Sequence, residues 1–173
     1  MRAREIWKAV VMDRVDFLDE LLSVLDAQGI RFCLIGGQAV NAYVAPLVSL
    51  DLDLAVVQLE TVEKILAARF RLQRFPQSLN VTAPGSDLRV QMHTDSRYSG
   101  FVARAGSRDV LGRMLPVASL EDVLQGKVWA AMDPDRRASK RRKDLLDIER
   151  LLEAYPRLHS LVPPEILDRL DRG

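Results

Sequence analysis

The segment LIGGQAVNAYVAPLVSLDLDLAVV, residues 34–57, constrains the fold most. It begins at the end of IRFCLI, a short apolar run rich in strand-forming residues that stops at Gly36 and Gly37. QAVNAYVA can then form a short helix that ends near Pro46. LDLDLAVV alternates strictly before it becomes fully apolar, which is typical of a strand whose two ends differ in burial. The segment therefore predicts a strand, a glycine turn, a helix and a second strand.

The rest of the chain predicts a mixed sheet followed by helices. Helical spacing over residues 13–27 and over ETVEKILAARF predicts two helices, and RLQRF, SLNVT, DLRVQMHT and YSGFVARAG predict strands. Turns are expected at residues 83–86 and at Gly106–Ser107. Helices are then expected from Ser119 to about Met132, over residues 139–155 and over PPEILDRL. The predicted fold class is α/β (α+β), with an α/β core at residues 1–116 and a helical part at 117–173 packed on it.

Composition narrows the class of partner. Twenty-five basic residues nearly balance twenty-four acidic ones, so net charge gives no reason to expect indiscriminate binding to nucleic acid or membranes. No eighteen consecutive residues are apolar, and the amino-terminal segment is interrupted by charges, so we expect a cytoplasmic protein with no membrane partner. Cys33 is the single cysteine, which excludes an intrachain disulfide, and we expect it to be buried.

Asp51 and Asp53 are the first candidates for chemistry. On a strand they share one face, with Cβ atoms about 6.5 to 7 Å apart, so both can reach divalent ions used in phosphoryl transfer. The backbone N–H groups of the Gly36–Gly37 turn could lie against phosphates. Either feature alone is common without any chemistry, in an edge strand or a tight turn. Two like charges side by side need a cation or exposure to relieve them, and the apolar neighbours make the combination favour a site.

The spacing resembles a known signature. Two glycines, thirteen intervening residues and then DLDL are similar to the motif of the nucleotidyltransferase superfamily that includes DNA polymerase beta. The helical segment SLEDVLQGKVWAAMDPDRRASKRRKDLLDIERLLE resembles that of the minimal AbiEii-type nucleotidyltransferases, which are often toxin–antitoxin components. The resemblance implies a transferase that uses an NTP and Mg²⁺ or Mn²⁺. It also implies an RNA or protein acceptor and an antitoxin-like partner.

The resemblance also implies a role for individual residues. Asp51 and Asp53 would bind the metal, and Lys127 would contact the nucleotide phosphates. The other residues that it places at the nucleotide or its phosphates are Gly36, Gly37, Ser49, Arg137, Lys143 and Asp144.

Two positions depart from the family pattern. Active members carry a third carboxylate on a later strand, and Gln91 occupies that place in LRVQMH. An amide cannot act as a general base. Leu47 stands where an arginine is expected. Asp87, His93 and Asp95 are the nearby groups that could compensate, and strand parity puts His93 on the face of Gln91 and Asp95 beyond the strand.

Several other residues allow two interpretations. The basic run at residues 140–143 could bind a nucleic-acid backbone or form a solvated helix turn. Asp144 and Asp147 share a helix face, so they could belong to the site or pair with Lys140 and Lys143. His159 is expected to be exposed, and Trp7 and Trp129 to be packing residues.

Two functions follow from these patterns. The first is a Mg²⁺-dependent nucleotidyltransferase that moves a nucleoside monophosphate onto a hydroxyl of RNA, protein or a small molecule. The second is a degenerate member that keeps the fold and acts by binding a nucleotide, protein or nucleic acid. Gln91 and Leu47 favour the second. The motifs of P-loop, dinucleotide-binding, zincin and serine-hydrolase proteins are absent from the sequence.

Overall fold

The computed structural model describes residues 16–172, which form two compact units. The first unit contains residues 16–33 and 49–103, and the second contains residues 34–48 and 104–172. The domain boundary near residue 116 that the sequence suggests stays a prediction. Within the described residues, no helix is both long enough and apolar enough to cross a bilayer.

The strands form one mixed sheet of seven in the order β3-β4-β5-β2-β1-β7-β6. β1 (Phe32–Ile35) pairs in parallel with β7 (Arg113–Val117), and β2 (Asp51–Val56) pairs in parallel with β5 (Arg89–His93). The pairs β3–β4, β4–β5 and β6–β7 are antiparallel. Parallel and antiparallel strands flanked by helices confirm the predicted α/β class.

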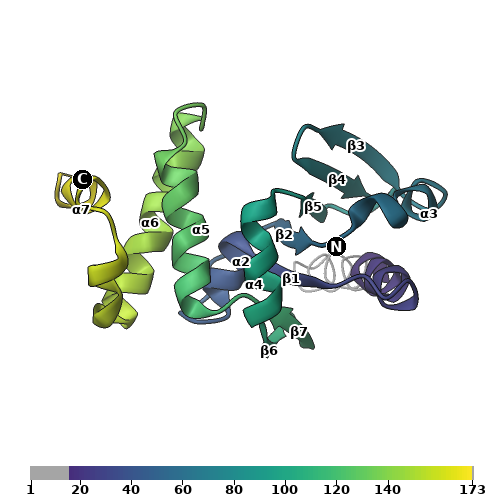
Figure 1. Cartoon of the computed structure of the whole chain (residues 1–173), viewed down its shortest axis with the longest axis horizontal. Helices are drawn as coiled ribbons and strands as arrows, with labels where there is room; N and C mark the ends of the chain where they lie inside the picture. The colour runs from purple at the N-terminus through teal and green to yellow at the C-terminus, as the bar shows by residue number, and fades with distance from the viewer. Residues whose placement is uncertain (1–15, 173) are drawn as a thin grey trace, which may run out of the picture. The chain divides into compact units, whose positions relative to one another are not determined.

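The first unit packs a helix and one sheet face around its core. Residues 16–27 are helical, and they bury Leu18, Leu21 and Leu25. β3 (Arg71–Phe75) and β4 (Ser78–Thr82) form a hairpin with α3 (Glu63–Ala67) next to it (Figure 1). Two short 3₁₀ helices, η1 (Leu59–Thr61) and η2 (Ser96–Tyr98), and α4 (Ser99–Arg104) complete the connections.

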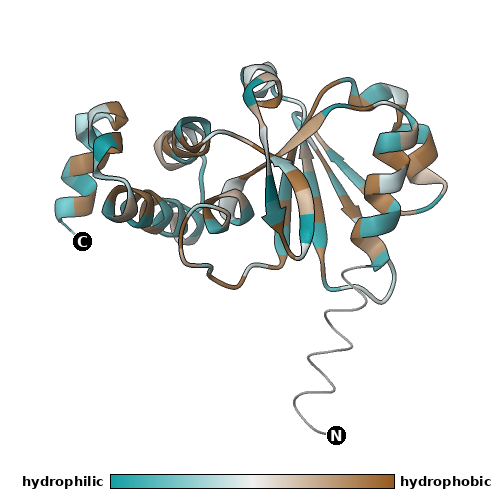
Figure 2. Cartoon of the chain, turned by 90° about the horizontal axis from the view of Figure 1, so that it is seen from below, coloured by the Kyte–Doolittle hydropathy of each residue, from teal (hydrophilic) through white to brown (hydrophobic). Residues whose placement is uncertain are grey.

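Period-two alternation gives this sheet one apolar face. Leu52, Leu79, Val81, Val90 and Met92 are fully buried on it. The residues between them in the chain are polar and belong to the opposite face. In Figure 2 teal and brown segments accordingly alternate along the strands.

The second unit begins with the glycine turn. Gly36 has φ +69°, a left-handed conformation that glycine adopts without a steric penalty, and α2 (Gly36–Asn41) follows directly. The predicted strand, glycine turn and helix are therefore confirmed. β6 (Gly106–Val110) and β7 form a hairpin closed by Leu111 and Gly112, which both have positive φ.

The helices of the second unit follow the predicted order. α5 (Leu120–Met132) is capped by Ser119, whose hydroxyl accepts from the Asp122 N–H, as predicted. α6 (Ala138–Ala154) runs beside α5 in Figure 1. The 3₁₀ helix η3 (Pro156–Leu161) and α7 (Pro164–Asp171), which starts with a proline, end the described chain.

The structure corrects three predictions. YSGFVARAG is not a strand, because α4 occupies most of it and buries Phe101 and Val102. Gly106 and Ser107 begin β6 instead of forming a turn. The predicted helix over residues 60–70 is two short pieces, η1 and α3.

Smaller predictions have mixed outcomes. Cys33 is buried and His159 is exposed, as predicted. Trp129 on α5 is half-buried. Trp7 and the first three residues of the helix predicted over residues 13–27 lie outside the described residues.

Candidate functional site

Asp51 and Asp53 lie on one face of β2, as the alternation predicts. Their side chains are 25% and 24% exposed, whereas Leu52 and Leu54 beside them are fully buried. Both carboxylates are therefore held on a rigid strand and remain accessible. That placement suits groups that bind a ligand.

Each carboxylate has a cationic or ionisable neighbour on β5. Nε and Nη2 of Arg89 donate to Oδ1 of Asp51 at 2.9 and 2.6 Å. Nε2 of His93 lies 3.0 Å from Oδ1 of Asp53. The register places Asp51 opposite Arg89 and Asp53 opposite Gln91, and this pairing brings the groups together. The sequence gives no signal for the contact with Arg89.

Gln91 lies opposite Asp53 in the β2–β5 register, and its correspondence to a third carboxylate stays a prediction. Its Nε2 donates to Oγ of Ser78 at 3.2 Å, and its backbone lies opposite Asn80 on the other side. β5 has no carboxylate of its own, since its sequence is RVQMH. On this strand, Arg89 and His93 share the face of Gln91.

The two aspartates that could compensate lie outside β5. Asp87 precedes the strand and is exposed. Asp95 follows it and caps η2, accepting from the Arg97 N–H at 2.9 Å. Its hydrogen bond to the Arg97 guanidinium lowers the pKa of the Asp95 carboxyl. The predicted positions of His93 and Asp95 are both confirmed.

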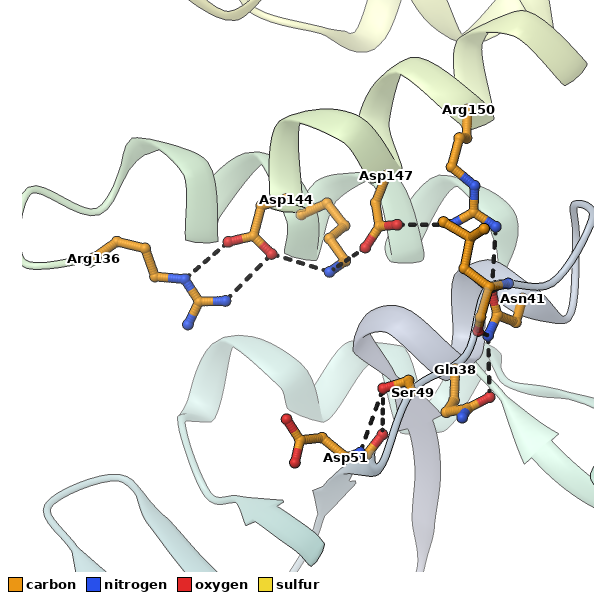
Figure 3. Close-up of polar contacts among 10 residues, drawn as sticks. Gln38, Asn41, Ser49, Asp51, Arg136, Asp144, Asp147 and Arg150 are labelled. Atoms are coloured by element: carbon orange, nitrogen blue, oxygen red, sulfur yellow. Dashed lines mark hydrogen bonds and ion pairs between the residues drawn. The ribbon is translucent and has the colours of Figure 1, made fainter. Parts of the chain in front are cut away.

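The Ser49 side chain hydrogen-bonds to the backbone at the start of β2. Its hydroxyl donates to the Asp51 carbonyl at 3.2 Å and accepts from the Asp51 N–H at 3.4 Å (Figure 3). These bonds fix the backbone where β2 begins. A contact between Ser49 and a nucleotide stays a prediction.

The donor set of the first unit fits Mg²⁺. No three His, Cys, Asp or Glu side chains within residues 16–172 are arranged as a metal cluster. Mg²⁺ does not require one, because it commonly binds one or two carboxylates and completes its octahedron with water and substrate phosphates. Asp51 and Asp53 supply two accessible carboxylates on one strand face. They are the residues that could hold the metal.

The second unit contains a buried ion network between α5 and α6. Nζ of Lys127 lies 3.0 Å from Oδ1 of Asp144 and 2.7 Å from Oδ2 of Asp147. Arg136 donates to Asp144, and Arg150 donates to Asp147 at 2.8 Å. Figure 3 shows the network as a row in which cations and carboxylates alternate. Both aspartates are almost fully buried.

Burial and charge act on Lys127 in opposite directions. Desolvation disfavours the ammonium form, but the charges of Asp147 and Asp144 favour it more, so the pKa of Lys127 is raised. In this structure Lys127 therefore stabilises the contact between two helices. Its predicted contact with nucleotide phosphates stays a prediction.

The glycine turn lies next to α6. A Cβ atom at Gly37 would lie 3.8 Å from Nζ of Lys143 and 4.0 Å from Oδ2 of Asp147. The turn, Lys143 and the ion network are thus neighbours within the second unit. Arg137 is the exposed residue that precedes α6.

The arginines of this network were not expected from the sequence. Arg150 follows Asp147 by three residues on α6, a helical spacing that could have indicated the pair. Arg136 pairs with Asp144 from the loop before the helix, and spacing does not indicate that contact. The pairing of Asp144 and Asp147 with Lys140 and Lys143 stays a prediction.

Neither a protein-family model nor a curated protein sequence matches the chain. Solved structures do match it. ANT(2″)-Ia in complex with adenylyl-2″-tobramycin is 15% identical, with 90% of this chain and 94% of that chain covered and a TM-score of 0.57. The lincomycin-bound lincosamide antibiotic adenylyltransferase LnuA is 12% identical, with 79% and 95% covered and a TM-score of 0.52.

A third match is an antigenic nucleotidyltransferase-like protein from Paracoccidioides brasiliensis. It is 16% identical, with 88% of this chain and 78% of that chain covered and a TM-score of 0.52. At such identities the similarity shows the fold and no more. The chain therefore has the nucleotidyltransferase fold that its motifs predict.

Proposed function

We propose that this protein is a Mg²⁺-dependent nucleotidyltransferase that transfers a nucleoside monophosphate from an NTP to an acceptor hydroxyl. The observation that carries the proposal is the pair Asp51 and Asp53. They lie accessible on one face of β2, on the strand that follows the glycine turn and α2, in a chain with the nucleotidyltransferase fold.

The proposed reaction forms one bond and breaks one. The acceptor oxygen bonds to the α-phosphorus, and the bond from that phosphorus to the bridging oxygen breaks. Pyrophosphate leaves with the electron pair, and the hydroxyl proton passes to solvent or to a base. Bound Mg²⁺ would neutralise charge on the phosphates. Asp51 and Asp53 would hold the metal, and Gln91 would not take the proton because an amide is not a base.

Residues of the second unit would bind phosphate in this proposal. Gly37 has no side chain, and the ammonium of Lys143 lies beside it, so a phosphate near the turn would meet a cation. Arg137 is a second exposed cation in the same helical segment. Lys127 and Asp144 would support these groups by holding α5 and α6 together.

Metal and nucleotide binding test the proposal. We would titrate Mn²⁺, followed by its electron paramagnetic resonance, into the native protein with and without each NTP, and measure transfer of α-³²P label to acceptors. The native protein should bind Mn²⁺, and Asp53→Ala should abolish both binding and transfer. Asp26→Ala is the matched control, because Asp26 is an exposed carboxylate on the helix at residues 16–27, outside β2.

Two results would contradict the proposal. Native protein that binds neither Mn²⁺ nor any NTP has no such site. Equal Mn²⁺ binding in Asp53→Ala and native protein would place the metal elsewhere.

A second function is favoured by Gln91. The resemblance implies a carboxylate at this position in active members, whereas the Gln91 amide hydrogen-bonds to Ser78, so the chain could bind a nucleotide without transferring it. Gln91→Asp discriminates between the two. An inert native protein with an active Gln91→Asp variant would support the binding function, and label transfer by the native protein would exclude it.

The finer assignments are part of the proposal. Three of them rest on the resemblance of residues 117–153 to AbiEii-type nucleotidyltransferases. These are membership of that group, an antitoxin-like partner, and an RNA or protein acceptor. The cytoplasmic location likewise stays a prediction.

A further inference from the structure

The sheet of the first unit has a polar face that continues well beyond Asp51 and Asp53. Strand pairing places Gln73 opposite Asn80, Asn80 opposite Gln91, and Gln91 opposite Asp53. Residues paired in this way project from the same face of a sheet. Three amide side chains therefore form a row across β3, β4 and β5 that leads to one of the candidate metal ligands.

A hollow of about 350 Å³ lies over β3, β4 and β5 on this unit. Its lining includes Arg71, Gln73, Asn80, Thr82 and Arg89. Its volume is near the lower limit for pockets that bind small ligands. The size suits one nucleotide unit.

An unsatisfied acceptor lies in the wall of the hollow. Oδ1 of Asn80 is buried and has no hydrogen-bond partner in the structure. Buried polar atoms are nearly always paired in native proteins, and a ligand or ordered water commonly supplies the missing donor. A donor group on a ligand in the hollow, or an ordered water, would satisfy this acceptor.

The charge of the lining indicates an anionic ligand. It contains the guanidinium groups of Arg71 and Arg89 and no carboxylate. The charge of Arg89 is partly offset by Asp51, and Arg71 is the second cation of the lining. Guanidinium groups bind phosphate through paired N–H donors.

The same face offers groups that recognise a base. Amide side chains such as Gln73 and Asn80 pair with the donor and acceptor edge of adenine, and single-stranded RNA ends expose that edge. Phe75 lies two residues beyond Gln73 on the same strand face and is 40% exposed. An exposed aromatic ring on a sheet gives a base a surface on which to stack.

We propose that this hollow binds the terminal nucleotide of a single-stranded RNA, with its phosphate on Arg71 and its base on the amide row and Phe75. The inference rests on the proposed function, because it names the acceptor of that reaction. Inorganic phosphate would use the arginines alone and leave the amides without a role. A polycation such as tobramycin would meet two guanidinium groups and be repelled.

Fluorescence anisotropy with 5′-labelled hexaadenylate RNA tests the proposal. The titration is done in EDTA without NTP, so metal-dependent binding does not contribute. Arg71→Ala should weaken binding about tenfold, the usual effect of losing a charged hydrogen bond, and Gln73→Ala should weaken it severalfold. Arg74→Ala is the matched control, because Arg74 projects from the opposite face of β3 and pairs with Glu63. Its affinity should equal that of the native protein.

Competition identifies the ligand class. AMP should displace the labelled RNA at concentrations at which inorganic phosphate and tobramycin do not. Displacement by phosphate as effectively as by AMP, or by tobramycin, would overturn the proposal. So would native protein that binds no RNA, or equal losses in Arg71→Ala and Arg74→Ala. Circular dichroism confirms that each variant is folded.

The acceptor site and the transferase can fail separately. If the native protein binds RNA through Arg71 but transfers no label from any NTP, the binding site stands and the proposed function fails. If it transfers label to a protein or small molecule while Arg71→Ala has no effect on RNA binding, the function stands and this inference fails.

Discussion

Replacing Lys127 by methionine should destabilise the second unit by about 3 kcal/mol. Lys127 is 6% exposed and contacts Asp144 and Asp147 at 3.0 and 2.7 Å. Removing one partner of a buried ion pair costs about 3 to 5 kcal/mol, because a buried charge is left uncompensated. Arg136 and Arg150 still contact the two carboxylates, which places the expected loss at the lower end of that range.

Urea unfolding followed by circular dichroism measures the loss. In a separate thermal unfolding experiment, the melting temperature should fall by about 6 to 12 °C, because each kcal/mol corresponds to about 2 to 4 °C for a chain of this size. Lys64→Met is the control, since Lys64 is exposed on α3, and its effect should stay within about 0.5 kcal/mol. Unchanged stability in Lys127→Met, with nucleotide binding lost, would refute the structural role and return Lys127 to the phosphate site.

The same variant has a signature at alkaline pH. The pKa of Lys127 is raised, so its charge stabilises the folded state below the unfolded pKa of about 10.4. That stability is lost as the pH rises through the raised value. The unfolding free energy of the native protein should therefore fall at alkaline pH toward that of Lys127→Met, and parallel pH profiles would contradict the assignment.

Three further outcomes are expected. Leu111 has φ +55° beside Gly112, so Leu111→Asn should stabilise the β6–β7 hairpin by about 1 kcal/mol in urea unfolding, and a loss would contradict the strained turn. Arg97 lowers the pKa of Asp95, so Asp95→Asn should cost less than about 1 kcal/mol at neutral pH. That difference should vanish as the pH falls through the lowered pKa, and a cost that persists there would show a different cause. Cys33 is fully buried, so it should react with a thiol reagent only as the protein unfolds, and rapid labelling of native protein would disprove its burial.

The parts of the fold that the sequence predicted are those encoded by local pattern. Alternation alone placed Asp51 and Asp53 on the accessible face of β2, and Gly36 marked the strand end because only its backbone adopts φ +69° easily. α4 was missed because YSGFVARAG contains the strand-forming residues Tyr98, Phe101 and Val102, and the nearby capping residue, Asp95, belongs to η2.

The sequence of the β6–β7 hairpin indicates its structure even less clearly than that of α4. Its turn is Leu111–Gly112, without the Asn-Gly or Asp-Gly pair that usually marks such turns. Pro116 in β7 also argues against a strand when only the sequence is read. The extended conformation of β7 is therefore determined by its pairing with β6 and β1 and not by local propensity.

Contacts between distant residues at the site also could not be predicted from the local sequence. Asp51 and Arg89 are thirty-eight residues apart, and only the β2–β5 register joins them. A register shifted by one residue would turn Arg89 to the other face of the sheet. Charge pairing across strands is therefore invisible to spacing, whereas the Ser119 cap and the Asp147–Arg150 pair are local and readable.

The contacts of Asp51 and Asp53 change what their proximity implies. Side by side, two carboxylates need a cation or exposure, and that need favoured a metal in the sequence. The structure supplies Arg89 and partial exposure, which relieve the repulsion between the two carboxylates. A metal at Asp51 must then compete with a guanidinium that donates two hydrogen bonds to Oδ1. Because NTP phosphates would add both ligands for the metal and negative charge to draw Arg89 away, the metal should bind more tightly with the nucleotide than alone.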